Sequence, residues 1–159
     1  RFGFQMSAIQ RALGNLGSVA PLLAQLAGDA TQNRTWLPGQ ILLHCEVGQF
    51  GAARRLLDRL GDAAALPRDD LYETALVYLA ESCAMLGDLR RCEALYGLLL
   101  PYRALNLSVL GTVALGSGAG ILALLAAKLR RGREARELFE EALAFHARIG
   151  APPLLARTQ

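Results

Sequence analysis

The sequence predicts an all-α fold, a right-handed superhelix of about four helical hairpins in a single domain that spans residues 1–159. Three observations lead to this prediction. A short phrase recurs four times, apolar residues follow each copy at helical spacing, and glycine, proline or polar residues separate the copies. The composition agrees, because a chain that is 53% apolar and 19% charged is not a disordered one.

The recurring phrase describes a helix end, a tight turn and the start of a second helix. An apolar residue is followed by glycine, which accepts the left-handed conformation at a helix end. The first apolar or small residue of the second helix is then Val19, Ala53, Cys92 or Ala135, at offsets of 34, 39 and 43 residues. In the fourth copy, Arg130 stands where the glycine is expected. One hairpin cannot bury its apolar face alone, so we expect the hairpins to stack.

The pattern predicts helices at about 3–13, 18–27, 36–47, 50–61, 69–86, 89–101, 107–129 and 132–149. These pair as hairpins over 3–27, 36–61, 69–101 and 107–149, and residues 153–159 begin a further helix. Asp69 and Asp70 are acidic residues that favour the start of the fifth helix, and Asp88 is the expected N-cap of the sixth helix. The chain begins at Arg1 and ends in a newly begun apolar run, so we expect it to be a fragment of a longer protein.

Residues 104–127 carry no charge, and that length is enough to span a bilayer. Gly116 and Gly120 also have the GxxxG spacing of membrane helix contacts. The stretch lies between two repeat units, however, and the helix after it is amphipathic in the manner of soluble proteins. We therefore expect a buried hairpin helix, straight or broken at its glycines, and no membrane contact.

We expect no catalytic residues, no metal ligands and no cofactor. Cys45, Cys83 and Cys92 lie inside apolar helical patterns and suit small buried side chains in a reducing cytoplasm. His44 and Cys45 are neighbours in a helix and so do not face one another, and His146 lies on an apolar face. The net charge of +3 comes from scattered arginine pairs, which indicate solvated surface and no direct contact with nucleic acid.

A polar and aromatic stripe is the candidate binding site. Thr74, Tyr78 and Glu81 share one side of the fifth helix, at spacings of four and three residues. The stripe is extended by residues on the first helices of the hairpins before and after it, namely Gln40, His44, Asn106 and Ser108. Such a stripe favours a concave groove for a partner or ligand, and the alternative is ordinary surface.

Several segments resemble one protein family. The pattern Gly87-Asp88, Cys92, Tyr96 is similar to the second helix of a tetratricopeptide repeat. Residues 66–69, 80–88, 95–102, 138–143 and 155–159 resemble the C-terminal helical-repeat region of large bacterial regulators. Those proteins join this region to a STAND-type or AAA-like ATPase module, and many carry a LuxR-type helix-turn-helix or a class III adenylate or guanylate cyclase domain.

The resemblance implies a cytoplasmic, non-catalytic sensor or protein-interaction domain that regulates transcription or cyclic-nucleotide synthesis. Its partner would be a protein or peptide, the parent's own ATPase domain or a small inducer. Nucleotide-binding and DNA-reading residues of such regulators lie in other domains. The alternative is an architectural spacer or a self-association module that forms a homodimer.

Overall fold

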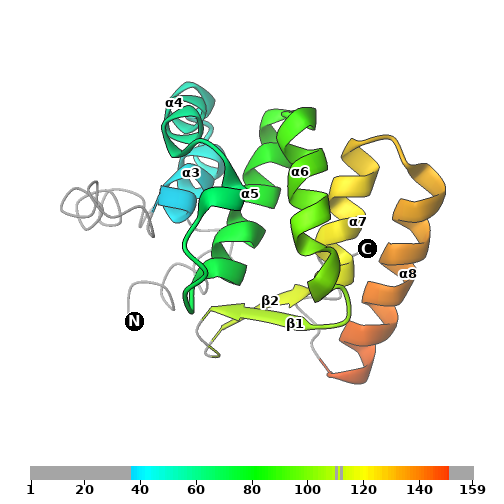
Figure 1. The fold of residues 1–159 in the computed structure, drawn as a ribbon. Coiled ribbons are helices and arrows are strands. Elements are labelled where there is room, and N and C mark those ends of the chain that lie inside the picture. Colours follow the sequence, from blue (N-terminus) through cyan, green and yellow to red (C-terminus); the bar gives the residue numbers. More distant parts are fainter. Residues whose placement is uncertain (1–36, 110, 112, 151–159) are drawn as a thin grey trace.

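The computed structural model describes residues 37–109, 111 and 113–150. Within these residues the chain forms six α-helices, two short 3₁₀ turns and one two-stranded sheet (Figure 1). In chain order the elements are α3 (Leu37–Glu46), α4 (Phe50–Leu60), η2 (Ala63–Ala65), α5 (Tyr72–Leu86), α6 (Leu89–Leu99), η3 (Leu100–Tyr102), β1 (Asn106–Val109), β2 (Val113–Ser117), α7 (Gly118–Lys128) and α8 (Gly132–Arg148). The predicted helical class is confirmed in this part of the chain, with a small sheet added to it.

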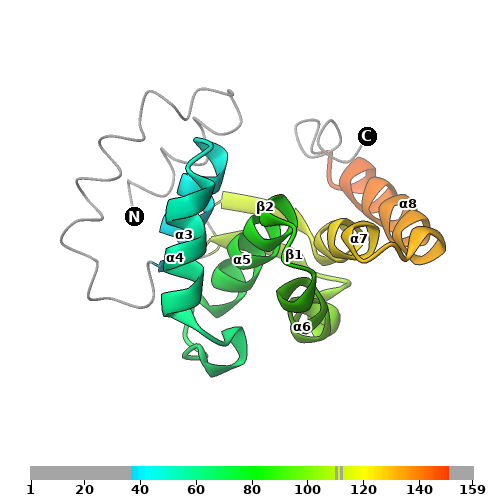
Figure 2. The ribbon, with the colours of Figure 1, turned by 90° about the horizontal axis from the view of Figure 1, so that it is seen from above.

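The helices form three hairpins that stack along one direction. Helices α3 and α4, α5 and α6, and α7 and α8 pair with each other, and α5 packs between α3 and α7 (Figure 2). Because α5 has neighbours on both sides, nearly all of its residues are buried. The predicted first hairpin at 3–27 and the further helix at 153–159 lie outside the described residues.

The turn at each hairpin tip has the left-handed residue that the repeated phrase predicts. Gly48 has φ 77°, Gly87 has φ 69°, and Arg130 takes the same conformation at φ 61°. The predicted N-cap is also confirmed, since the Arg91 backbone N–H donates to Asp88 Oδ1 at 3.1 Å. The first buried positions of the second helices, Ala53, Cys92 and Ala135, all lie in the core.

The prediction of one helix over 107–129 is wrong. An antiparallel hairpin of β1 and β2 occupies the first part of the segment, and α7 begins only at Gly118. Gly111 and Gly116 have φ values of 68° and 116°, which no α-helix can contain. Ser117 then caps α7, because its Oγ accepts the Gly120 N–H at 3.1 Å. Asn106, expected at a helix start, therefore begins a strand.

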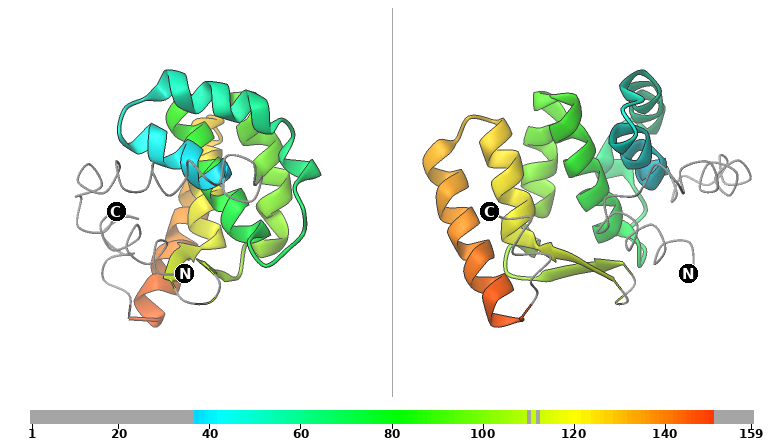
Figure 3. Two further views of the ribbon diagram at one scale, coloured as in Figure 1. Left: turned by 90° about the vertical axis from the view of Figure 1, so that its left-hand side faces the viewer. Right: turned by 180° about the vertical axis from the view of Figure 1, so that it is seen from behind.

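The β hairpin runs across the stack below the helices in Figure 3 and contacts α5, α7 and α8. Thr74 Oγ1 of α5 donates to the carbonyl of Ser108 in β1 at 3.3 Å. The backbone N–H of Ser117 in β2 donates to Nε2 of His146 in α8 at 3.0 Å. In each strand, a helix side chain thus forms a hydrogen bond with a backbone group. These bonds occupy groups that could otherwise pair with another strand.

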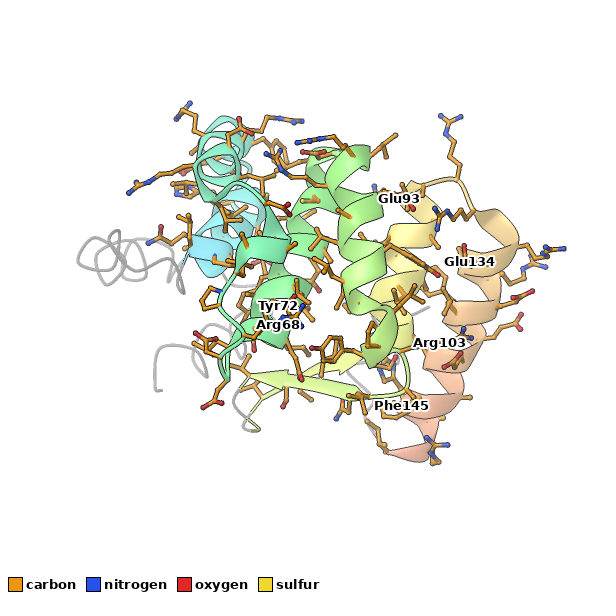
Figure 4. The ribbon with its side chains drawn as sticks, viewed as in Figure 1. Arg68, Tyr72, Glu93, Arg103, Glu134 and Phe145 are labelled. Atoms are coloured by element: carbon orange, nitrogen blue, oxygen red, sulfur yellow. The ribbon has the colours of Figure 1, made fainter. Side chains whose placement is uncertain are left out.

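Polar contacts join the outer faces of α6 and α8. Arg131 donates to Glu93 at 2.6 Å, and the Tyr96 hydroxyl donates to Glu134 Oε1 at 2.6 Å. Arg103, just after η3, forms an ion pair with Glu141 at 2.6 Å. Figure 4 labels Glu93, Glu134 and Arg103 along this seam. Burial and the neighbouring Glu134 raise the pKa of Tyr96 to about 12, so its hydroxyl stays a donor at neutral pH.

The uncharged stretch does not supply a membrane span in the described part of the chain. None of the helices there is long and apolar enough to cross a bilayer. The strands interrupt the stretch, and α7, the helix that remains, runs from Gly118 to Lys128.

Candidate binding cleft

The predicted stripe on α5 exists as one helix face, but much of it is covered. Thr74 is 3% exposed and Glu81 is 5% exposed, while Tyr78 is half-buried against the core. Thr74 points at the β hairpin, because its hydroxyl donates to Ser108. The structure thus turns part of the expected groove into a packing surface between α5 and β1.

The other predicted groove residues lie on two different elements. Gln40 and His44 are half-buried on α3, and His44 Nδ1 lies 2.7 Å from Gln49 Oε1. Asn106 is exposed at the start of β1, two residues from the Thr74 contact at Ser108. Gln40 and His44 thus come from a separate helix, whereas Asn106 belongs to the strand that Thr74 touches.

A polar cleft opens beside this contact. It lies between the start of α5, the end of η3 and the β hairpin, and its volume is about 680 Å³. Volumes of this order accommodate small-molecule ligands. Among the described residues, the cleft is lined by Arg68, Asp69, Asp70, Tyr72, Glu73, Tyr102, Ser108 and Gly111. Of these residues, only Ser108 belongs to the predicted binding stripe.

Local turn chemistry places the acidic wall of the cleft. Asp69 Oδ1 accepts the Leu71 N–H at 3.0 Å, and the Asp69 carbonyl accepts the Tyr72 N–H at 3.0 Å. Asp69 thereby turns the chain into α5, as the sequence led us to expect of this acidic helix start. Asp70 is exposed and Glu73 half-buried in the first turn, and both line the cleft.

Tyr72 is the unusual residue of the cleft wall. It is 4% exposed, and its hydroxyl oxygen is buried without a hydrogen-bond partner among the described residues. The guanidinium carbon of Arg68 lies 4.9 Å from the centre of its ring, a cation–π contact (Figure 4). A buried hydroxyl without a partner costs about 1–3 kcal/mol, so it calls for an explanation beyond packing.

A second, smaller cavity of about 310 Å³ lies between α4, α5 and α6. Its floor consists of core residues such as Leu57, Leu79 and Leu95, and Arg91 stands at its rim. The Arg91 guanidinium is already engaged by Asp58 at 3.0 Å and Asp88 at 2.6 Å. We interpret this cavity as the seam between two hairpins.

The buried thiols are poor nucleophiles. Burial, together with neighbouring thiol and carboxylate groups, raises the pKa of Cys83 to about 12. Burial likewise raises the pKa of Cys92 to about 11, so both thiols are protonated at neutral pH. In the described part of the chain, no group of three or more histidine, cysteine or acidic residues is placed to hold a metal ion.

No protein-family model, curated protein or solved structure matches this chain. The class of the protein is therefore defined by its own fold and cleft. Over the described residues it is a stack of α-helical hairpins with a β hairpin inserted before the last one.

Proposed function

We propose that this chain is a non-catalytic binding module of a larger cytoplasmic regulator. In this proposal the hairpins continue as a right-handed, tetratricopeptide-like superhelix. The module controls a bacterial STAND-type or AAA-like ATPase whose output is transcription or cyclic-nucleotide synthesis. The resemblance of residues 66–69, 80–88, 95–102 and 138–143 to such repeat regions supports the proposal, as does the stacking of three helical hairpins.

The cleft beside α5 carries the binding part of this proposal. It brings the turn into α5 together with η3 and the β hairpin, which come later in the chain, and its wall includes Tyr72, whose hydroxyl is buried without a described partner. A buried hydroxyl without a partner calls for an explanation, and a bound ligand would supply one. We therefore assign the cleft to a small inducer.

Titration of the isotope-labelled chain in NMR tests this function. Amino acids, polyamines, nucleotides and short peptides are added one compound at a time, and backbone amide shifts are followed. We expect at least one compound to shift the amides of residues 68–73 and 102–111, and to be recovered unchanged. A chain whose cleft amides respond to none of these compounds, or that converts one into a product, would contradict the proposal.

Self-association is the second candidate, and one observation favours it. Leu100, Leu105 and Ile149 are large apolar side chains that remain 46%, 49% and 43% exposed. In this case the module forms a homodimer through apolar surface that is otherwise costly in water. Light scattering of the wild type and of Leu105→Asp decides between the candidates, since only a dimer interface would make the mass fall in the variant.

A further inference from the structure

We propose that the cleft binds a small molecule with two cationic centres, such as a diamine or a guanidino-amine, and that one centre replaces the Arg68 guanidinium over the ring of Tyr72. This inference rests on the proposed function, because it names the class of ligand for the same cleft. Four features of the cleft support it: a cation already bound, an excess of carboxylates, an unpaired hydroxyl and a size that suits a small molecule.

The cleft already holds a cation in the form of Arg68. Its guanidinium carbon lies 4.9 Å from the centre of the Tyr72 ring, and Arg68 itself is exposed. No ion pair holds Arg68 to any residue in the described part of the chain. An exposed cation–π contact is weak, so a ligand cation can displace this side chain.

The charge balance of the cleft selects a cation over an anion. The carboxylates of Asp69, Asp70 and Glu73 stand against the single guanidinium of Arg68, which leaves a net charge of −2. Only Asp69 has a hydrogen-bond donor among the described residues, the Leu71 N–H. A ligand with two positive centres neutralises this charge, whereas a phosphate or carboxylate ligand would be repelled by all three acids.

The hydroxyl of Tyr72 supplies a hydrogen-bond partner for such a ligand. Its oxygen has no partner among the described residues, and Arg68 covers one face of the ring to which it belongs. Tyr72 lines the cleft, and an ammonium or guanidinium N–H of the ligand that reaches its phenolic oxygen would give this acceptor the hydrogen bond it lacks among the described residues. Tyr102, half-buried in the same wall, offers a second aromatic surface.

Calorimetric titration of the full chain with agmatine tests this assignment, with inorganic phosphate as the anionic probe. We expect agmatine to bind and phosphate not to bind. Arg68→Ala should tighten agmatine binding about 3-fold, because the competing intramolecular cation is gone. Tyr72→Phe and Glu73→Gln should each weaken it about 5-fold, as the hydrogen-bond acceptor or a charge is lost.

Glu140→Gln is the matched control, because it removes one carboxylate from the exposed surface of α8. It should leave the affinity for agmatine unchanged. Thermal unfolding of Tyr72→Phe separates binding from folding. Because the hydroxyl has no described partner, the free variant should be at least as stable as the wild type while binding agmatine less well.

Three results would overturn the inference in different ways. Binding of phosphate that is lost in Arg68→Ala would assign the cleft to anions, and the proposed binding function would stand. Equal affinity in Glu73→Gln, Tyr72→Phe and Glu140→Gln would show that agmatine is held by general surface charge. Absence of any ligand in the cleft, by calorimetry and by the NMR titration above, would remove both the ligand class and the proposed function.

Discussion

Two consecutive parts of the chain differ in the contacts that determine their conformation. They are the hairpin of α5 and α6 and the segment from Arg103 to Gly118. In the hairpin, neighbouring residues determine the turn: Gly87 takes the left-handed conformation and Asp88 caps the next helix. In the segment from Arg103 to Gly118, residues from distant helices determine the conformation. The Ser108 carbonyl accepts a hydrogen bond from Thr74 Oγ1, and the Ser117 N–H donates to His146 Nε2. Local chemistry therefore specifies the helical repeat, and tertiary contacts specify the β hairpin.

This difference predicts where the fold is most easily broken. The distant contacts converge on the start of α7, where the Gly118 N–H donates to the Leu105 carbonyl at 2.9 Å and the Ala119 N–H to the Arg103 carbonyl at 2.9 Å. A side chain on Gly118 would overlap the carbonyl oxygen of Tyr102. The backbone can approach this closely only because residue 118 has no Cβ.

The largest effect is expected for Gly118→Ala. The new methyl group must push the η3 end and the start of α7 apart, so the variant should lose about 3 kcal/mol of unfolding free energy in urea denaturation. Gly97→Ala is the matched control, because a Cβ there meets nothing within 4 Å in the middle of α6. It should stabilise the chain by about 1 kcal/mol through helix propensity. Equal stability of the two variants would contradict the assigned close approach.

A smaller effect is expected at Asp88, the N-cap of α6, because its side chain is charged as well as hydrogen-bonded. Burial alone would raise the pKa of Asp88, but hydrogen bonds from the Arg91 guanidinium and backbone, together with the nearby arginine charges, hold it below its usual range. Asp88→Asn keeps an N-cap oxygen and removes the charge, so it should cost about 1 kcal/mol at pH 7.

The pH dependence of this cost follows from the lowered pKa. Because the folded-state pKa lies below the unfolded value of about 4, the charge stabilises the fold above that pH and stops doing so as the pH falls through the folded-state pKa. Urea denaturation of both chains at several pH values should therefore show a constant difference from about pH 5 to pH 7 that shrinks below about pH 4. A difference that did not shrink as the pH fell would show that the carboxylate charge is not its source.

The same contrast explains how far the sequence could predict the fold. Helices α3, α4, α6 and α8 lie within about two residues of their predicted bounds, because spacing, caps and turn residues are all local signals. Residues 107–117 were assigned to a helix because their apolar run suits a buried helix as well as a strand. The glycines that exclude the helix, Gly111 and Gly116, were visible in the sequence, but their positive φ angles were not.

The cleft was harder to predict than the fold. The acidic helix start at Asp69 followed from the sequence, and it is confirmed. The opposing wall comes from Tyr102, Ser108 and Gly111, about 30 to 40 residues further along the chain. No spacing rule joins these positions, and an unpaired hydroxyl is a property of the packed core, so neither could be found without the structure.

The smallest expected effect tests the local side of the comparison. Arg130 occupies the left-handed position that glycine fills at the other two described hairpin tips, Gly48 and Gly87. For a residue with a Cβ, the left-handed conformation raises the free energy of the folded state by about 1 kcal/mol or more. Glycine avoids this cost, but it also gives the unfolded chain more conformational freedom, which offsets part of the gain. Arg130→Gly should thus stabilise the chain by about 0.5 kcal/mol in urea denaturation, while Gly87→Arg should destabilise it. If Arg130→Gly lowered stability, the arginine side chain would be contributing more than its backbone strain costs, and the repeated phrase would not be the local signal that closes the last hairpin.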